Sequence, residues 1–443
     1  MVREKIIFST VGIVVTLLIF SFGALAGYFL PVQLAPIIST AYSKLPFGKE
    51  EPNVTFSMEV YEKIMAEYWE DLTDEQLVDF YIQAIRKQQL QVDIQINNKQ
   101  QLANALDRII KKIERGKRGD FTINVTSAVL TNLRPQGRSL LYTQKQETAL
   151  KNLVQNINPE KDLYQDLGVE KNTPVEKVAE IASQKQVELE KEKRTTREST
   201  KVAEINKKVE AIQYAKEVLT APEKKQRYDT YGIEPTVATR LISKDVLHLH
   251  IMKMSPTTFE EFKKAIEAFD KQGGPTSLIF DLTGNIGGSL DIVPLLTGAF
   301  LGNNQYAFDL YRKGKPEVIR TKIDKLSELL RYKQIVVLVD ENGQSSAELT
   351  AAVLKRYKIG LLLGKKTKGW GTIERLYPIK AQIDPNEKYS LFLVNNITLR
   401  DDGQPIEGRG VEPSISLDNP SWDKELSDYF KDSGFVNAIK QVI

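Results

Sequence analysis

The sequence predicts an α/β fold, because short apolar strand patterns alternate with amphipathic helical patterns over its second half. Residues 277–282 (SLIFDL) and 334–340 (QIVVLVD) have the composition of buried strands. After the second of these, Leu349, Val353 and Leu354 recur at helical spacing. The chain has 443 residues, 41% hydrophobic and 27% charged, an ordinary globular composition with room for two or three domains.

Composition excludes several classes of function. The net charge of +3 gives no case for binding nucleic acid. The absence of Cys excludes disulfides, thiol chemistry and thiolate metal sites. The two histidines, His248 and His250, lie on one face of a predicted strand. We predict no metal site and no cofactor.

Residues 1–36 predict a transmembrane signal anchor. Arg3 and Lys5 precede an uncharged run, residues 6–30, whose 25 residues exceed the roughly 20 that cross a bilayer. Because the positive charges precede this run, we expect a single pass in the cell membrane with the bulk of the chain extracytoplasmic. Ala24-Leu25-Ala26 leaves a cleavable signal peptide as the alternative.

A linker over residues 37–55 and a helical region over residues 56–160 are predicted next. Val60, Ile64 and Tyr68 share one helical face, and Thr73 with Gln76 forms a capping-box pattern.

Ser345 and Ser346 lie where the strand at 334–340 turns into the following helix. A serine at such a turn can be a nucleophile that is held close to the backbone N–H groups of the helix start. Alternatively, a serine here caps the helix, and Glu348 completes a capping box. The local pattern leaves both interpretations open.

This segment resembles the carboxyl-terminal processing peptidases, or tail-specific proteases, which use a Ser/Lys dyad. Their S-A-S-E motif matches residues 345–348 (SSAE), so Ser345 stands at the nucleophile position. Their T-F-G-K-G-T-V-Q loop matches residues 367–374 (TKGWGTIE) without a gap. Trp370 therefore occupies the position of the catalytic lysine, and Glu374 that of the supporting glutamine.

The tryptophan removes the family's general base. A Ser/Lys mechanism needs a neutral amine to accept the serine proton, whereas an indole N–H only donates. Lys368 is the candidate for a displaced base. It is two residues from Trp370, and side chains two residues apart point to the same face of an extended loop. Glu374 is a weaker candidate.

Two further motifs extend the resemblance over roughly residues 239–417. Residues 283–288 (TGNIGG) are similar to a family turn whose glycine N–H groups form part of the oxyanion hole, which assigns Gly287 and Gly288 to that role. Residues 400–413 are similar to the family's closing R-x-x-x-G-x-x-I-x-G-x-G-I-x-P motif. The resemblance implies a ClpP/crotonase-like core over 237–420, followed by a helical tail over 421–443. It gives His248 and His250 no catalytic role.

Where the family usually has a PDZ domain, residues 162–232 resemble a J domain (DnaJ-like). Residues 162–169 (DLYQDLGV) match the opening of that domain, and residues 222–232 (PEKKQRYDTYG) match its fourth helix. Its His-Pro-Asp loop is missing, and residues 190–200 (EKEKRTTREST) stand in its place. We therefore expect a helical insert over 161–236 that packs or docks and does not stimulate an Hsp70.

Two functions follow from the resemblance. The first is a membrane-anchored serine peptidase of the cell envelope that processes exported or unfolded polypeptides, with Ser345 as nucleophile. The second is a non-catalytic pseudopeptidase that binds such polypeptides, because Trp370 replaces the lysine.

Overall fold

The computed structural model describes residues 51–88, 96–270 and 274–443. Pro52–Ile443 forms one compact unit. The predicted membrane anchor, residues 1–36, lies outside the described residues. Among the residues that are described, no helix is long and apolar enough to cross a membrane.

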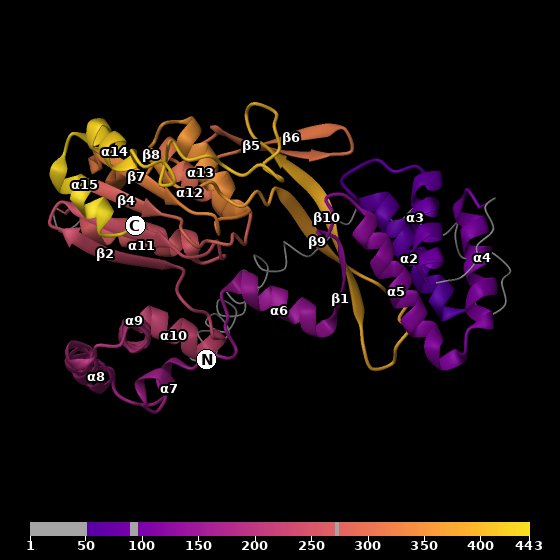
Figure 1. Ribbon diagram of the computed structural model, residues 1–443, viewed down its shortest axis with the longest axis horizontal. Coiled ribbons are helices and arrows are strands. Elements are labelled where there is room, and N and C mark those ends of the chain that lie inside the picture. Colours follow the sequence, from indigo (N-terminus) through magenta and orange to yellow (C-terminus); the bar gives the residue numbers. More distant parts are fainter. Residues whose placement is uncertain (1–50, 89–95, 271–273) are drawn as a thin grey trace, which may run out of the picture. The chain divides into compact units, whose positions relative to one another are not determined.

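The first part of the described chain is helical (Figure 1). Its helices are α2 (Pro52–Glu67), α3 (Asp74–Lys87), α4 (Lys99–Lys112) and α5 (Arg118–Asn132), with a short 3₁₀ helix at Arg115–Lys117. The expected capping box between Thr73 and Gln76 begins α3, and both of its hydrogen bonds form. Helix α2 begins at Pro52, inside the segment predicted as a linker, because proline is compatible with the first turn of a helix.

These helices pack on a five-stranded sheet. Its strands are β1 (Leu140–Thr143), β5 (Tyr306–Arg312), β6 (Lys315–Arg320), β9 (Thr372–Pro378) and the long β10 (Tyr389–Leu399). Buried residues of β10, including Leu391 and Leu393, share one apolar core with Phe56 and Val60 of α2. Strand β1 lies within the region predicted to be only helical, and helix α6 (Gln144–Gln155) follows it.

The α/β prediction is confirmed by a six-stranded sheet. The strands lie in the order β11 (Ile415–Ser416), β8 (Leu361–Gly364), β7 (Gln334–Val339), β4 (Ser277–Asp281), β3 (Val246–Ile251) and β2 (Val237–Ser243). All neighbours are parallel except β2 and β3.

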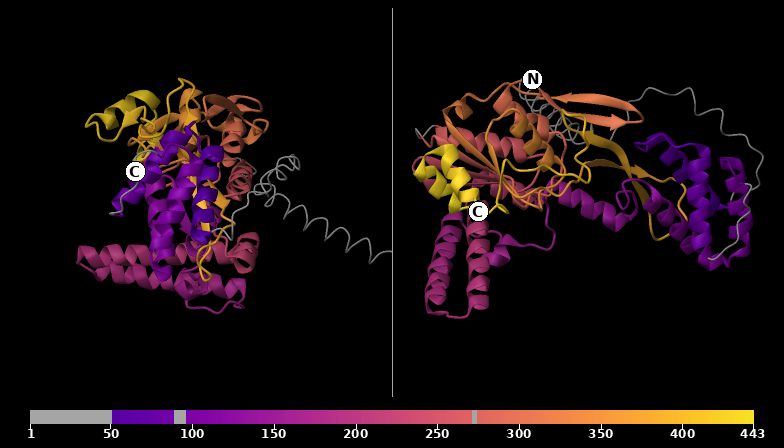
Figure 2. Two further views of the ribbon diagram at one scale, coloured as in Figure 1. Left: turned by 90° about the vertical axis from the view of Figure 1, so that its right-hand side faces the viewer. Right: turned by 45° about the horizontal axis from the view of Figure 1, so that its top comes forward.

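Helices cover both faces of this sheet, as the continuous apolar strands require. One apolar core contains buried residues of α11 (Thr258–Asp270), α12 (Ile292–Leu301) and α13 (Ser346–Arg356). The other contains those of α14 (Trp422–Phe430) and α15 (Ser433–Lys440), which lie in the predicted helical tail (Figure 2).

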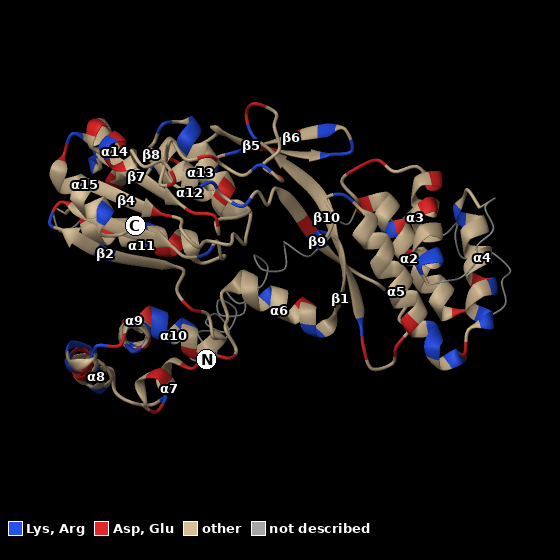
Figure 3. Cartoon of the chain, viewed as in Figure 1, with Lys and Arg blue, Asp and Glu red and all other residues tan. Residues whose placement is uncertain are grey.

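The segment predicted as an insert contains α7 (Leu163–Leu167), α8 (Val175–Thr195), α9 (Ser199–Thr220) and α10 (Pro222–Tyr231). These helices share an apolar core of their own, in which Leu163, Val178 and Leu219 are fully buried. Acidic and basic residues are interspersed in the sequences of α8 and α9, and both colours appear on these helices in Figure 3. Residues 190–200, predicted to replace the His-Pro-Asp loop, are mostly helical, and the connection between α8 and α9 is only three residues, Thr196 to Glu198.

Candidate active site

Ser345 is the residue between β7 and α13 with an unusual backbone. It is the N-cap of α13, and its N–H donates to Glu348 Oε2 at 2.8 Å, which is one half of the predicted capping box. Its φ of 58° and ψ of −126° differ from the extended backbone that N-cap residues normally adopt. A non-glycine residue at positive φ costs about 1–3 kcal/mol and is typical of functional sites. The same strained strand-to-helix turn exposes the nucleophile in hydrolases, so capping alone does not explain it.

The glycine turn packs directly against Ser345. A Cβ atom on Gly287, whose φ is 82°, would lie 2.8 Å from the Ser345 Cβ and 2.8 Å from the Gln344 carbonyl oxygen. A Cβ atom on Gly288, whose φ is 139°, would lie 2.1 Å from the Met254 carbonyl oxygen. Both positions therefore require glycine, and the structure brings together the predicted nucleophile and the predicted oxyanion turn.

The N–H donors near Ser345 differ in their availability. The Gly287 N–H donates to Asn285 Oδ1 at 2.8 Å, so it already has an acceptor. Among the described residues, nothing accepts a hydrogen bond from the N–H of Gly288 or from that of Ser346 at the start of α13. Gly288 is exposed, whereas Ser346 is fully buried. A bound carbonyl oxygen therefore fits the N–H of Gly288 better than that of Gly287 or Ser346.

Glu348 joins the nucleophile turn to the loop that contains Trp370. Its side chain is fully buried. Its Oε2 accepts from the N–H groups of Ser345 and Trp370, each at 2.8 Å. Its Oε1 accepts from the Gly369 N–H at 2.7 Å and the Thr367 hydroxyl at 2.5 Å. Burial raises the pKa of this carboxyl. The four hydrogen bonds lower it, but by less than burial raises it. The sequence predicted only its capping role.

Trp370 is held on two sides at the position of the family's lysine. Its indole Nε1 donates to Glu374 Oε1 at 3.1 Å. The Arg138 guanidinium carbon lies 3.5 Å from the centre of its ring, a close cation–π contact. Arg138 also donates to Glu407 Oε1 at 2.9 Å, and Glu407 Oε2 accepts from the Gly371 N–H at 2.7 Å. Nothing in the local sequence indicated that Arg138 reaches this loop.

Glu374 has the environment of a carboxyl group that is neutral part of the time. Its Oε1 also accepts from the Thr372 hydroxyl at 2.5 Å. Burial raises the pKa of Glu374 to about 7, against the lowering effect of the Thr372 and Trp370 hydrogen bonds. Its carboxylate accepts hydrogen bonds from Trp370 and Thr372 and, among the described residues, forms none with Ser345.

Lys368, the candidate for a displaced base, is exposed. Its backbone N–H donates to the Gly343 carbonyl at 3.0 Å, which fixes the loop. Lysines that serve as bases are desolvated, because burial favours the neutral amine. The surroundings of Lys368 therefore do not support the displaced-base hypothesis.

The two histidines organise the start of the glycine turn. His248 Nε2 lies 2.9 Å from Asp281 Oδ2, and His250 Nε2 lies 3.0 Å from the Thr283 carbonyl oxygen. Asp281 Oδ1 accepts from both the N–H and the hydroxyl of Thr283. Over residues 51–88, 96–270 and 274–443, no cluster of three or more His, Cys, Asp or Glu side chains fits a metal ion.

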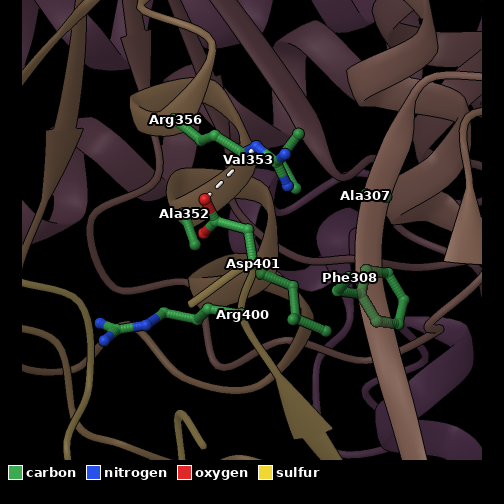
Figure 4. Close-up of a pocket in the computed structure, with 8 residues that line it drawn as sticks. Ala307, Phe308, Ala352, Val353, Arg356, Arg400 and Asp401 are labelled. Carbon is green, nitrogen blue, oxygen red and sulfur yellow. Dashed lines mark ion pairs between the residues drawn. The ribbon is translucent and has the colours of Figure 1, made fainter. Parts of the chain in front are cut away.

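A small cavity lies beside α13, between its residues Ala352, Val353 and Arg356 and Phe308 of β5 (Figure 4). Arg356 pairs with Asp401 across it at 3.5 Å. Its volume of about 10 Å³ has room for one water molecule at most. It is not a substrate site.

Comparison with known proteins finds the same peptidase family that the sequence motifs resemble. Residues 245–417 match the model of peptidase family S41. The carboxy-terminal processing protease CtpA of Bacillus subtilis is 27% identical over 197 residues, which are 44% of this chain and 40% of that protein. A CtpA-like serine protease of Staphylococcus aureus is 28% identical over 173 residues, 39% of this chain and 33% of that protein. The chain thus spans less than half the length of these curated relatives.

The solved structures to which this chain is similar include two that it covers over more than nine tenths of their length. The photosystem II D1 C-terminal processing protease has a TM-score of 0.47 at 12% identity, covering 83% of this chain and 93% of that one. A lipoprotein from Streptococcus agalactiae has a TM-score of 0.45 at 12% identity, covering 87% and 99%. From the family match and the curated relatives, residues 245–417 of this chain are similar to a peptidase family S41 domain, the domain of the carboxy-terminal processing proteases.

Proposed function

We propose that this chain is a pseudopeptidase, a member of its family that binds exported or unfolded polypeptides without cleaving them through a Ser/Lys dyad. The observation that carries the proposal is Trp370. Its indole fills the position of the lysine, donates to Glu374 and stacks on Arg138. An indole N–H cannot accept the proton of the Ser345 hydroxyl. Loss of general-base assistance typically lowers the rate about 10²–10⁴-fold.

The parts that bind a peptide are retained. The strained turn presents Ser345, and the N–H of the exposed Gly288 has no acceptor among the described residues. Donors fixed at such a turn bind a substrate carbonyl even where no bond is broken. The same strained turn favours a second candidate, a serine peptidase with Ser345 as nucleophile and a base other than the family's lysine.

A four-variant experiment separates the two candidates. Wild type, Ser345→Ala, Lys368→Ala and the double variant Trp370→Lys, Glu374→Gln are incubated with a fluorescently labelled unfolded protein. We expect no cleavage by wild type and a gain of about 10²-fold or more in the double variant, because an amine returns to the base position. Glu374→Gln is included since a neighbouring carboxylate would hold the new ammonium in its charged form.

The controls decide between the candidates. Adding Ser345→Ala to the double variant must abolish the gain, which shows that the restored activity uses Ser345. Binding of the labelled substrate to wild type, followed by fluorescence anisotropy, measures the proposed function directly. Cleavage by wild type that both Ser345→Ala and Lys368→Ala abolish would overturn the pseudopeptidase proposal and identify Lys368 as the base.

We also propose that residues 6–30 anchor the protein in the cell membrane, with the bulk of the chain outside the cytoplasm. The support is the uncharged run preceded by Arg3 and Lys5. Protease added to intact spheroplasts is expected to digest the large domain. Complete protection in spheroplasts, with digestion after lysis, would contradict this topology.

A further inference from the structure

The helical region contains a cavity that the peptidase fold does not explain. It has a volume of about 160 Å³ and lies between the end of α2, the start of α3 and the end of α5. Its apolar walls are Tyr68, Leu72 and Phe80. A cavity of roughly 150 Å³ with apolar walls accommodates a benzene molecule, so this one has room for a large apolar side chain.

The cavity also contains a buried donor without an acceptor. The Nδ2 atom of Asn132, at the end of α5, is shielded from solvent and has no hydrogen-bond partner among the described residues. A buried amide donor that lacks an acceptor is unfavourable. A ligand that supplies an acceptor oxygen would satisfy it.

Two opposite charges line the same cavity and are unpaired. Neither Arg134 nor Glu70 forms an ion pair within 4.0 Å in the part of the chain that the structure describes. Both charges act on Tyr68: burial raises the pKa of its hydroxyl most, Glu70 raises it further, and Arg134 lowers it. The Arg134 carbonyl accepts from the Tyr68 hydroxyl at 2.5 Å and from Trp69 Nε1 at 2.7 Å, so the backbone that carries the guanidinium is held in place.

We propose that this cavity binds an apolar α-amino acid as a zwitterion. The ligand carboxylate is bound by the Arg134 guanidinium and the Asn132 amide, and its ammonium group by the Glu70 carboxylate. The side chain lies between Leu72 and Phe80. A ligand with both charges and an apolar side chain contacts the Asn132 amide, both charges and the apolar walls, whereas a purely apolar ligand would leave the buried Asn132 amide without a partner.

Calorimetric titration of the full-length chain tests the proposal with four probes: L-leucine, L-phenylalanine, N-acetyl-L-leucine and L-leucinamide. We expect the two zwitterions to bind and the two blocked compounds to bind at least about 10-fold more weakly, because each lacks one charge. Arg134→Ala is expected to weaken leucine binding by at least about 10-fold. Glu70→Gln is expected to reduce the difference between leucine and N-acetyl-leucine.

The matched control is Arg115→Ala, which removes an exposed arginine of the same helical region that does not line the cavity. It should leave leucine binding unchanged. Circular dichroism and melting temperature of every variant show whether the helices remain folded. N-acetyl-leucine that binds as tightly as leucine would overturn the zwitterion proposal in favour of a peptide chain end. Absence of binding by both amino acids at millimolar concentration would overturn the site itself.

Discussion

Replacing Glu374 by Gln is expected to stabilise the protein at neutral and alkaline pH. Burial raises the pKa of this carboxyl from an ordinary 4.5 to about 7. A group whose pKa is raised on folding contributes stability below its unfolded pKa and loses it as the pH rises through its folded pKa. One pKa unit corresponds to about 1.4 kcal/mol, so the ionised carboxylate costs the folded protein about 3 kcal/mol above pH 7.

The amide removes that cost and keeps the local contacts. The Gln side-chain oxygen can accept from Trp370 Nε1 and the Thr372 hydroxyl, as Glu374 Oε1 does. Urea unfolding, followed by tryptophan fluorescence, is measured at several pH values between about 4.5 and 8. We expect the variant to exceed wild type by about 3 kcal/mol at the upper end of this range, with the difference disappearing at the lower end.

Glu317→Gln, on the exposed strand β6, is the control for the loss of one negative charge. It should not reproduce the pH-dependent gain. A Glu374→Gln variant whose stability difference from wild type is the same at every pH would refute the reasoning, since the cost would then not come from ionisation. A variant that is less stable than wild type at the upper end would refute it as well.

Two further predictions concern the connection at Glu348 and the helical insert. Glu348→Ala should lower the free energy of unfolding by about 4 kcal/mol or more, because it leaves four donors, several of them buried, without their acceptor. Glu348→Gln, which keeps one acceptor oxygen, should lose less in the same urea experiment, and equal losses would contradict the hydrogen-bond argument. Residues 162–232 should not stimulate the ATPase of a bacterial Hsp70, since the His-Pro-Asp loop is absent. A clear rate increase on adding this segment would show that another surface serves that purpose.

Local patterns in the sequence were sufficient for much of the site. Local spacing predicted the strand, turn and helix around Ser345, and the resemblance to the tail-specific proteases assigned the glycine pair at 287–288 and Trp370 to their places in the site. Each of these features depends on residues that are neighbours in the chain, where spacing and backbone requirements act directly. The start of α2 at Pro52 was not predicted, because segment boundaries depend on packing as well as on propensity.

Only the tertiary structure decided which side chains of the candidate site are buried and which groups they contact. It stacks Arg138 on Trp370, pairs Arg138 with Glu407, and leaves Lys368 exposed. It also supplies an acceptor to the Gly287 N–H, leaves the N–H of the exposed Gly288 without an acceptor among the described residues, and buries Ser346 completely. A side chain's burial and its partners are set by residues far away in the chain, and these determine its pKa and its hydrogen bonds. The sequence by itself determined which chemical groups stand at each position of the candidate site, and folding determined which of them are buried, paired or exposed.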